Sequence, residues 1–187
     1  IIINIVEHEF RLRFRTSIGG KNMVECQKCL DPTAFGLFLV AVVSLPLAIL
    51  QFKNEGVPSA AFFELMGILI IAVAFLAYRS DSNFGFIVFG LVGAAVALTG
   101  FGMGEWECVT FALVFVLAII WSVIVKTPKA LSLILVTTAL IFLFVGLSVI
   151  IGGDYWHWLI GAAALFNFIF NIYLSYALAL DGKIPVI

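Results

Sequence analysis

Residues 131–152 read Leu-Ser-Leu-Ile-Leu-Val-Thr-Thr-Ala-Leu-Ile-Phe-Leu-Phe-Val-Gly-Leu-Ser-Val-Ile-Ile-Gly, a run of 22 residues without a charged side chain. An α-helix rises about 1.5 Å per residue, so a run of this length crosses the hydrocarbon core of a bilayer, which is about 30 Å thick. Only helices and closed barrels satisfy their backbone polar groups in lipid, and this run is too long and continuous for a barrel strand. It therefore predicts a transmembrane helix.

Five further runs have the same character, and short connectors with charges and turn-forming residues separate them. These runs are Ala34–Phe52, Ala60–Tyr78, Phe84–Met103, Val109–Val125 and Trp156–Leu180. The whole chain is 64% apolar and 11% charged, whereas soluble domains are about 45–50% apolar and about 25% charged. The sequence therefore predicts an all-α, polytopic six-helix bundle over residues 31–187, with the lipid bilayer as its surroundings.

The positions of lysine and arginine predict the orientation of this bundle. If both chain ends are cytoplasmic, the outer connectors contain only Lys53, while the inner side from Met23 onward has Lys28, Arg79, Lys126, Lys129 and Lys183. Cytoplasmic loops of membrane proteins carry an excess of such residues, which predicts both ends inside. Because the sequence lacks a barrel pattern, we expect the plasma membrane.

Residues 1–30 precede the first apolar run and form a separate region. Charged and apolar side chains alternate over residues 9–15, which is typical of an extended segment and not of a spanning helix. We expect a cytoplasmic arm over residues 1–30. Met23 could serve as a start, so residues 1–22 are either part of that arm or an extension ahead of the native start.

Polar side chains inside the last span lie on one helical face. Asn167, Asn171 and Ser175 are spaced at i, i+4 and i+8. Such a stripe is either part of a solute pathway or a set of hydrogen bonds that holds helices together. Thr137 in the fifth span is a further candidate for the pathway, although threonine often bonds to its own helix.

Other functional classes find little support in the sequence. The net charge of −1 gives no electrostatic case for a nucleic-acid partner. No cluster of cysteine, histidine and carboxylate residues has catalytic or metal-ligand spacing. We therefore expect neither an enzyme nor a metal or other cofactor. Glu64, in the second span, either reaches the membrane interface or takes part in a pore or in proton movement.

Two segments resemble the acetate uptake transporter family, which includes the bacterial succinate–acetate permeases. Residues 31–37, Asp-Pro-Thr-Ala-Phe-Gly-Leu, are similar to the family's Asn-Pro-x-Pro-Leu-Gly-Leu signature at the start of the first span. Residues 78–85, Tyr-Arg-Ser-Asp-Ser-Asn-Phe-Gly, are similar to its Tyr-x-x-Gly-Asn-x-Phe-Gly segment. The resemblance covers about residues 31–180. Asp31, Ala34 and Phe35 depart from the signature, so the chain resembles a divergent member.

This resemblance implies a hexamer of six-helix protomers, each with a narrow pathway for small monocarboxylates such as acetate. Transport would be proton-coupled or channel-like. Taken together, the polar stripe and the family segments give the predicted pathway residues Asn167, Asn171, Asp31, Phe35, Asn83, Phe84 and Thr137.

Two alternatives remain open. A structural or assembly protein that has lost its pathway would have a core filled with side chains. A pore for a small neutral solute such as urea would fit the acidic outer connectors better than an anion pathway does.

Overall fold

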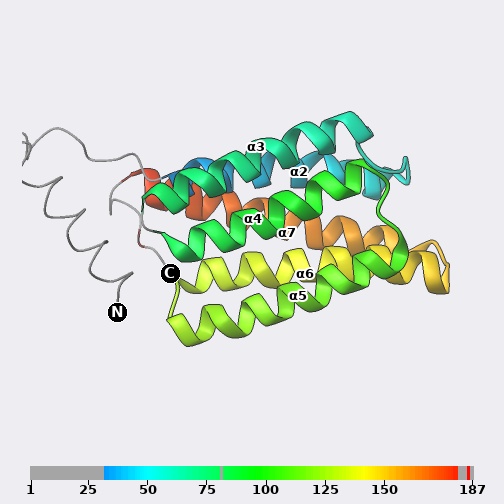
Figure 1. The fold of residues 1–187 in the computed structure, drawn as a ribbon. Coiled ribbons are helices and arrows are strands. Elements are labelled where there is room, and N and C mark those ends of the chain that lie inside the picture. The colour runs from blue at the N-terminus through cyan, green and yellow to red at the C-terminus, as the bar shows by residue number, and fades with distance from the viewer. Residues whose placement is uncertain (1–31, 81, 181–184, 186–187) are drawn as a thin grey trace, which may run out of the picture. The chain divides into compact units, whose positions relative to one another are not determined.

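The computed structural model describes residues 32–80, 82–180 and 185 (Figure 1). The predicted N-terminal arm and Asp31 lie outside these residues. The described part forms six helices, α2 (Pro32–Lys53), α3 (Ala60–Arg79), α4 (Asn83–Gly100), α5 (Glu105–Val125), α6 (Lys129–Ile151) and α7 (Tyr155–Ala179). All six are long and apolar enough to cross a membrane. The prediction of an all-α bundle with six spans is confirmed.

The helix boundaries differ from the apolar runs where charged residues extend a helix. Helix α5 begins at Glu105 and not at Val109, and both Glu105 and Glu107 lie in its first turn. Acidic side chains are favourable there because the exposed N–H groups at a helix N-terminus carry partial positive charge. Helix α4 ends at Gly100, before Met103, and Gly102 then adopts a positive φ of 91° in the connection. An apolar run therefore marks the membrane-embedded part of a helix better than its ends.

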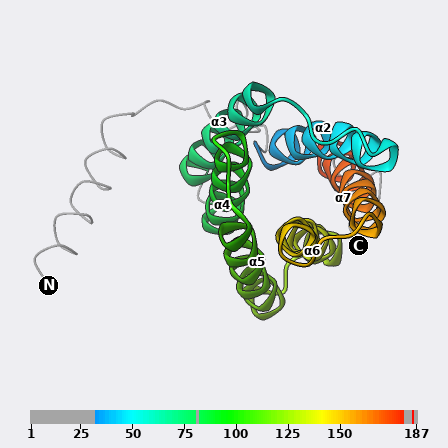
Figure 2. The same ribbon diagram turned by 90° about the vertical axis from the view of Figure 1, so that its right-hand side faces the viewer.

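Neighbouring helices pack in the order α4–α3–α2–α7–α6–α5. Figure 2, which looks along the bundle, shows the helices arranged in a ring in this order. We call the end with the connections 54–59, 101–104 and 152–154 the outer end, and the end with the connections 80–82 and 126–128 the inner end, following the orientation that the sequence predicts. Helices α4 and α5 are the two end members of this order.

Small residues bring α3 and α4 into backbone contact. A Cβ atom added to Gly67 would lie 2.4 Å from the backbone nitrogen of Ala97, and one added to Gly93 would lie 2.8 Å from that of Ile71. Side chains at these positions would force the helices apart, because close approach of helices in membranes depends on small residues. Gly93 and Ala97 of α4 therefore serve helix packing.

Helices α4 and α5 meet at the inner end through aromatic side chains. The ring centroids of Phe84 and Trp121 are 5.0 Å apart. Phe84 lies in the first turn of α4, and Trp121 lies in the second half of α5. This contact joins the two end members of the ring at its inner end.

Candidate functional site

The bundle encloses a cavity of about 120 Å³ to which all six helices contribute side chains. One water molecule needs about 10–15 Å³ of such volume, so the cavity has room for several waters or for one small solute. Its lining is mostly apolar, with Val40, Val43, Val92, Val96, Ile141 and Phe142 among the contributing residues. None of the described residues that line it is charged. The cavity is therefore a small and largely apolar compartment.

The cavity occupies the outer half of the bundle. Its rim includes Val57 and Met103 from two outer connections, and the Val57 side chain is 58% exposed. Its deepest polar residues, Ser44, Thr138 and Asn167, lie near the middle of α2, α6 and α7. We call these three residues the polar floor. The polar floor therefore lies at about the middle of the helices, below the rim.

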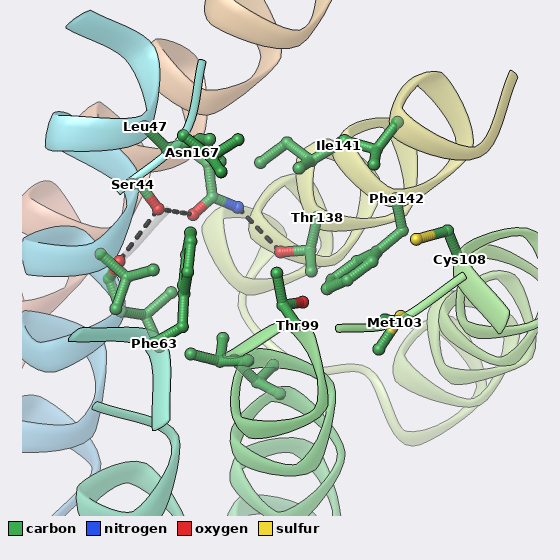
Figure 3. A pocket seen from close by; sticks show the side chains of 16 residues that line it. Ser44, Leu47, Phe63, Thr99, Met103, Cys108, Thr138, Ile141, Phe142 and Asn167 are labelled. Atoms are coloured by element: carbon green, nitrogen blue, oxygen red, sulfur yellow. Dashed lines mark hydrogen bonds between the residues drawn. The ribbon is translucent and has the colours of Figure 1, made fainter. Parts of the chain in front are cut away.

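Asn167 connects the polar floor to both neighbouring helices. Ser44 Oγ lies 2.8 Å from Asn167 Oδ1, and Asn167 Nδ2 lies 2.9 Å from Thr137 Oγ1 and 2.8 Å from Thr138 Oγ1. Figure 3 shows the bonds to Ser44 and Thr138 at the edge of the cavity. Asn167 is 1% exposed. One amide therefore joins α7 to α2 and to α6.

Backbone carbonyls fix the orientation of the two asparagine amides. Asn167 Nδ2 lies 3.2 Å from the carbonyl oxygen of Ile134, and Asn171 Nδ2 lies 2.8 Å from that of Asn167. Carbonyl oxygens only accept hydrogen bonds, so rotating either amide by 180° would place two acceptors against each other. In both amides the nitrogen atom, and not the oxygen atom, therefore faces the backbone carbonyl.

Asn171 has one polar atom without a partner. Its nitrogen lies 2.8 Å from Asn167 Oδ1, one turn away on α7, but its own Oδ1 is buried and has no hydrogen-bond partner among the described residues. Farther toward the inner end, Ser175 donates to the carbonyl oxygen of Ala34 at 2.7 Å. The stripe on α7 thus binds helices together, as one of the two interpretations of the sequence predicts, and it also leaves a free acceptor below the floor.

The structure brings three of the predicted pathway residues together, namely Asn167, Asn171 and Thr137. Of these, Asn167 lines the cavity. Phe35 is 55% exposed on the surface of the bundle, and Asn83 is exposed at the start of α4. Phe84 contacts Trp121 and does not line the cavity. None of the described residues in the two segments that resemble the transporter family lines the cavity.

Glu64 is also separate from the cavity. It lies in the second turn of α3 and is partly exposed. A Cβ atom added to Gly100 of α4 would lie 2.6 Å from Glu64 Cγ. The side chain of Glu64 therefore runs along the contact between α3 and α4. The adjacent residue, Phe63, points into the cavity instead.

Three polar cavity residues were not among the predicted pathway residues: Ser44, Thr99 and Thr138. Thr138 is adjacent to Thr137 in the sequence, and sequence alone does not decide which of the two side chains faces the cavity. Ser44 is a single hydroxyl in an apolar run, and Thr99 lies close to the end of its helix. A polar residue in a span usually faces protein or water, and this signal could have marked Ser44.

The rim is held by a second polar contact between α2 and α7. Gln51 Nε2 donates to the carbonyl oxygen of Gly56 at 2.7 Å, so its Oε1 faces His157 Nδ1 at 2.8 Å. His157 must then carry a hydrogen on Nδ1. The pair fixes the connection that includes the rim residue Val57.

Among the described residues, no group of three or more histidine, cysteine, aspartate or glutamate side chains could hold a metal ion. No family model, curated protein or solved structure matches the chain. The resemblance to acetate transporters therefore stays a prediction.

Proposed function

We propose that this multi-pass membrane protein is a transporter or channel that takes a small polar solute from its outer end into the central cavity. The observation that carries the proposal is the cavity itself, which all six helices line and which ends on the polar floor. Membrane proteins place polar residues of their spans toward such pathways. Apolar walls with a few polar groups are typical of small-solute sites.

The cavity also separates this proposal from a purely structural role. A scaffold that had lost its pathway would have a core filled with side chains, whereas the described helices leave about 120 Å³ unfilled. Acetate as the substrate, proton coupling, a hexamer and the plasma membrane stay predictions from the resemblance and the sequence pattern.

Passage through the protein requires movement at the polar floor. The side chains of Asn167, in the floor itself, and of Asn171, one turn below it, are fully buried. The contacts of Asn167 with Ser44 and Thr138 cross between helices, so small shifts of α2 or α6 relative to α7 would open them. We therefore assign the floor the role of a gate between the outer cavity and the inner half of the bundle.

Filling the cavity tests the proposal. Val96 lines the cavity, while Leu98 on the same helix is 46% exposed on the surface of the bundle. In proteoliposomes, Val96→Phe should lower the flux of small solutes such as urea, acetamide and acetate, and Leu98→Phe should leave it unchanged. Both proteins must elute as folded, monodisperse species. Equal flux in the two variants, or no flux above protein-free vesicles for the unmodified protein, would contradict the proposal.

A further inference from the structure

Each hydroxyl group that faces the cavity already donates its hydrogen to another oxygen atom of the protein. Thr99 Oγ1 donates to the carbonyl oxygen of Ala95 at 2.8 Å, and Thr138 Oγ1 donates to that of Ile134 at 2.8 Å. Ser44 has one hydrogen, and it lies between the carbonyl oxygen of Val40 at 2.9 Å and Asn167 Oδ1 at 2.8 Å. These hydroxyls can still accept hydrogen bonds through their remaining lone pairs.

The amide of the polar floor has no free hydrogen either. Asn167 Nδ2 has two hydrogens, and three acceptors surround it, namely Thr137 Oγ1, Thr138 Oγ1 and the carbonyl oxygen of Ile134. The orientation of this amide is fixed, so it cannot turn its nitrogen toward a solute. Among the side chains of the described residues that line the cavity, only the thiol of Cys108 keeps a free donor, and a thiol is a weak donor. The polar side chains of the cavity therefore present acceptors.

Because the cavity offers free hydrogen-bond acceptors and almost no free donors, it suits some solutes better than others. A carboxylate only accepts hydrogen bonds, so it would meet oxygen lone pairs, and none of the described lining residues carries a charge that would stabilise it. A cation would lack a counter-charge for the same reason. A neutral molecule with N–H or O–H groups would donate to the hydroxyl oxygens and place its apolar part against the valines.

We infer that the solute is a small neutral hydrogen-bond donor of the amide or urea class and not a monocarboxylate. This inference rests on the proposed function, since it names the substrate of the same cavity. The free acceptor below the floor has the same character: Asn171 Oδ1 is buried, no described residue donates to it, and it lies one turn from Asn167 toward the inner end. An unpaired buried acceptor is costly, and a donating solute or a water molecule would relieve that cost.

Acetamide and acetate form a matched pair of probes because they have nearly the same size. Acetamide has a neutral NH₂ group at the position where acetate has a negatively charged oxygen. Fluxes into proteoliposomes are measured at slightly alkaline pH, where acetate is ionised, and fluxes into protein-free vesicles are subtracted. We expect acetamide to enter at least about tenfold faster than acetate, a ratio that corresponds to about 1.4 kcal/mol. Equal or faster entry of acetate would overturn the inference and leave the proposed function standing. No protein-dependent entry of either solute would overturn both.

Two threonine variants locate the acceptor. Thr99 lines the cavity, while Thr110 on α5 is exposed on the surface of the bundle and donates to the carbonyl of Trp106 at 2.8 Å, in the same i−4 geometry. Thr99→Val should lower acetamide flux about two- to tenfold, the range for one neutral hydrogen bond. Thr110→Val should leave it unchanged. Unchanged acetamide flux in Thr99→Val, with the protein folded, would overturn the role of the cavity acceptors.

Discussion

Ser44 on α2 and Asn167 on α7, 123 positions apart in the chain, are joined by a hydrogen bond of 2.8 Å at the floor of the cavity. The amide nitrogen of the same asparagine donates to the hydroxyl groups of Thr137 and Thr138 on α6. A side chain that faces the cavity thus also holds three helices together. The sequence offered a pathway and a helix clamp as alternatives, and in the structure the same residue both lines the cavity and bonds the helices together.

Replacing Asn167 with leucine should destabilise the bundle. Leucine has a similar size but leaves Ser44, Thr138 and Asn171 without their shared partner. Hydrogen bonds between helices in membranes contribute on average about 0.6 and at most about 1.7 kcal/mol, so a loss of about 1–2 kcal/mol is expected. The free energy of unfolding in detergent measures it.

Thr110→Val is the control for this change, because Thr110 bonds only to its own helix on the exposed surface. Its unfolding free energy should match that of the unmodified protein. If Asn167→Leu were as stable as this control, the clamp would have no energetic importance.

Two glycine positions give a matched test of helix packing. A Cβ atom on Gly67 would lie 2.4 Å from the backbone of Ala97, whereas one on Gly90 would meet nothing within 4 Å. Overpacking costs about 1–3 kcal/mol, so Gly67→Ala should lower the melting temperature in detergent. Gly90→Ala should leave it unchanged or raise it slightly, because alanine favours a helix over glycine by about 1 kcal/mol. Equal melting temperatures would mean that α3 and α4 can separate at no cost.

The fold was largely predictable because its main cause is local. Each span is an apolar run of sufficient length, and lipid leaves the backbone little choice but a helix. Gly93 and Ala97, small residues of the third span, lie at the close contact with α3, where membrane helices commonly place small residues. The boundary at Glu105 was less predictable because charged residues extend α5 beyond the apolar region, and the boundary at Gly100 because α4 ends inside its apolar run, ahead of the turn at Gly102.

The aromatic contact at the inner end makes a different prediction. The rings of Phe84 and Trp121, 5.0 Å apart, join α4 to α5, and these helices are the end members of the packed ring. Trp121→Ala removes this contact and should increase solute flux through the inner half of the bundle. Stopped-flow swelling of proteoliposomes measures the flux.

Trp158→Ala provides the comparison for that experiment. Trp158 contacts Phe52, with centroids 5.4 Å apart, between the well-packed helices α2 and α7 at the outer end. Its loss should leave flux unchanged. A fall in flux for Trp121→Ala would instead assign the contact a role in keeping the pathway intact.

The site was less predictable than the fold. The spacing of polar residues shows that they share one face of a helix, but not whether that face lines a cavity or contacts another helix. Asn167, Asn171 and Ser175 share a face of α7, yet only Asn167 reaches the cavity, and the other two bond to backbone carbonyls. Which hydrogens remain free depends on neighbours from α2 and α6. Ser44 becomes a cavity residue only through the packing of α2 against α7.

Glu64 gives the last prediction, because it distinguishes an interfacial carboxylate from one that carries protons along the pathway. The side chain lies along the α3–α4 contact near the outer end, while the cavity is lined by its neighbour Phe63. Glu64→Gln should therefore leave both the solute flux and its pH dependence unchanged. Flux into proteoliposomes over a range of external pH measures both, with Val96→Phe as the blocked reference. A loss of flux or of pH dependence in Glu64→Gln alone would place the carboxylate in the transport mechanism and the entrance of the pathway between α3 and α4.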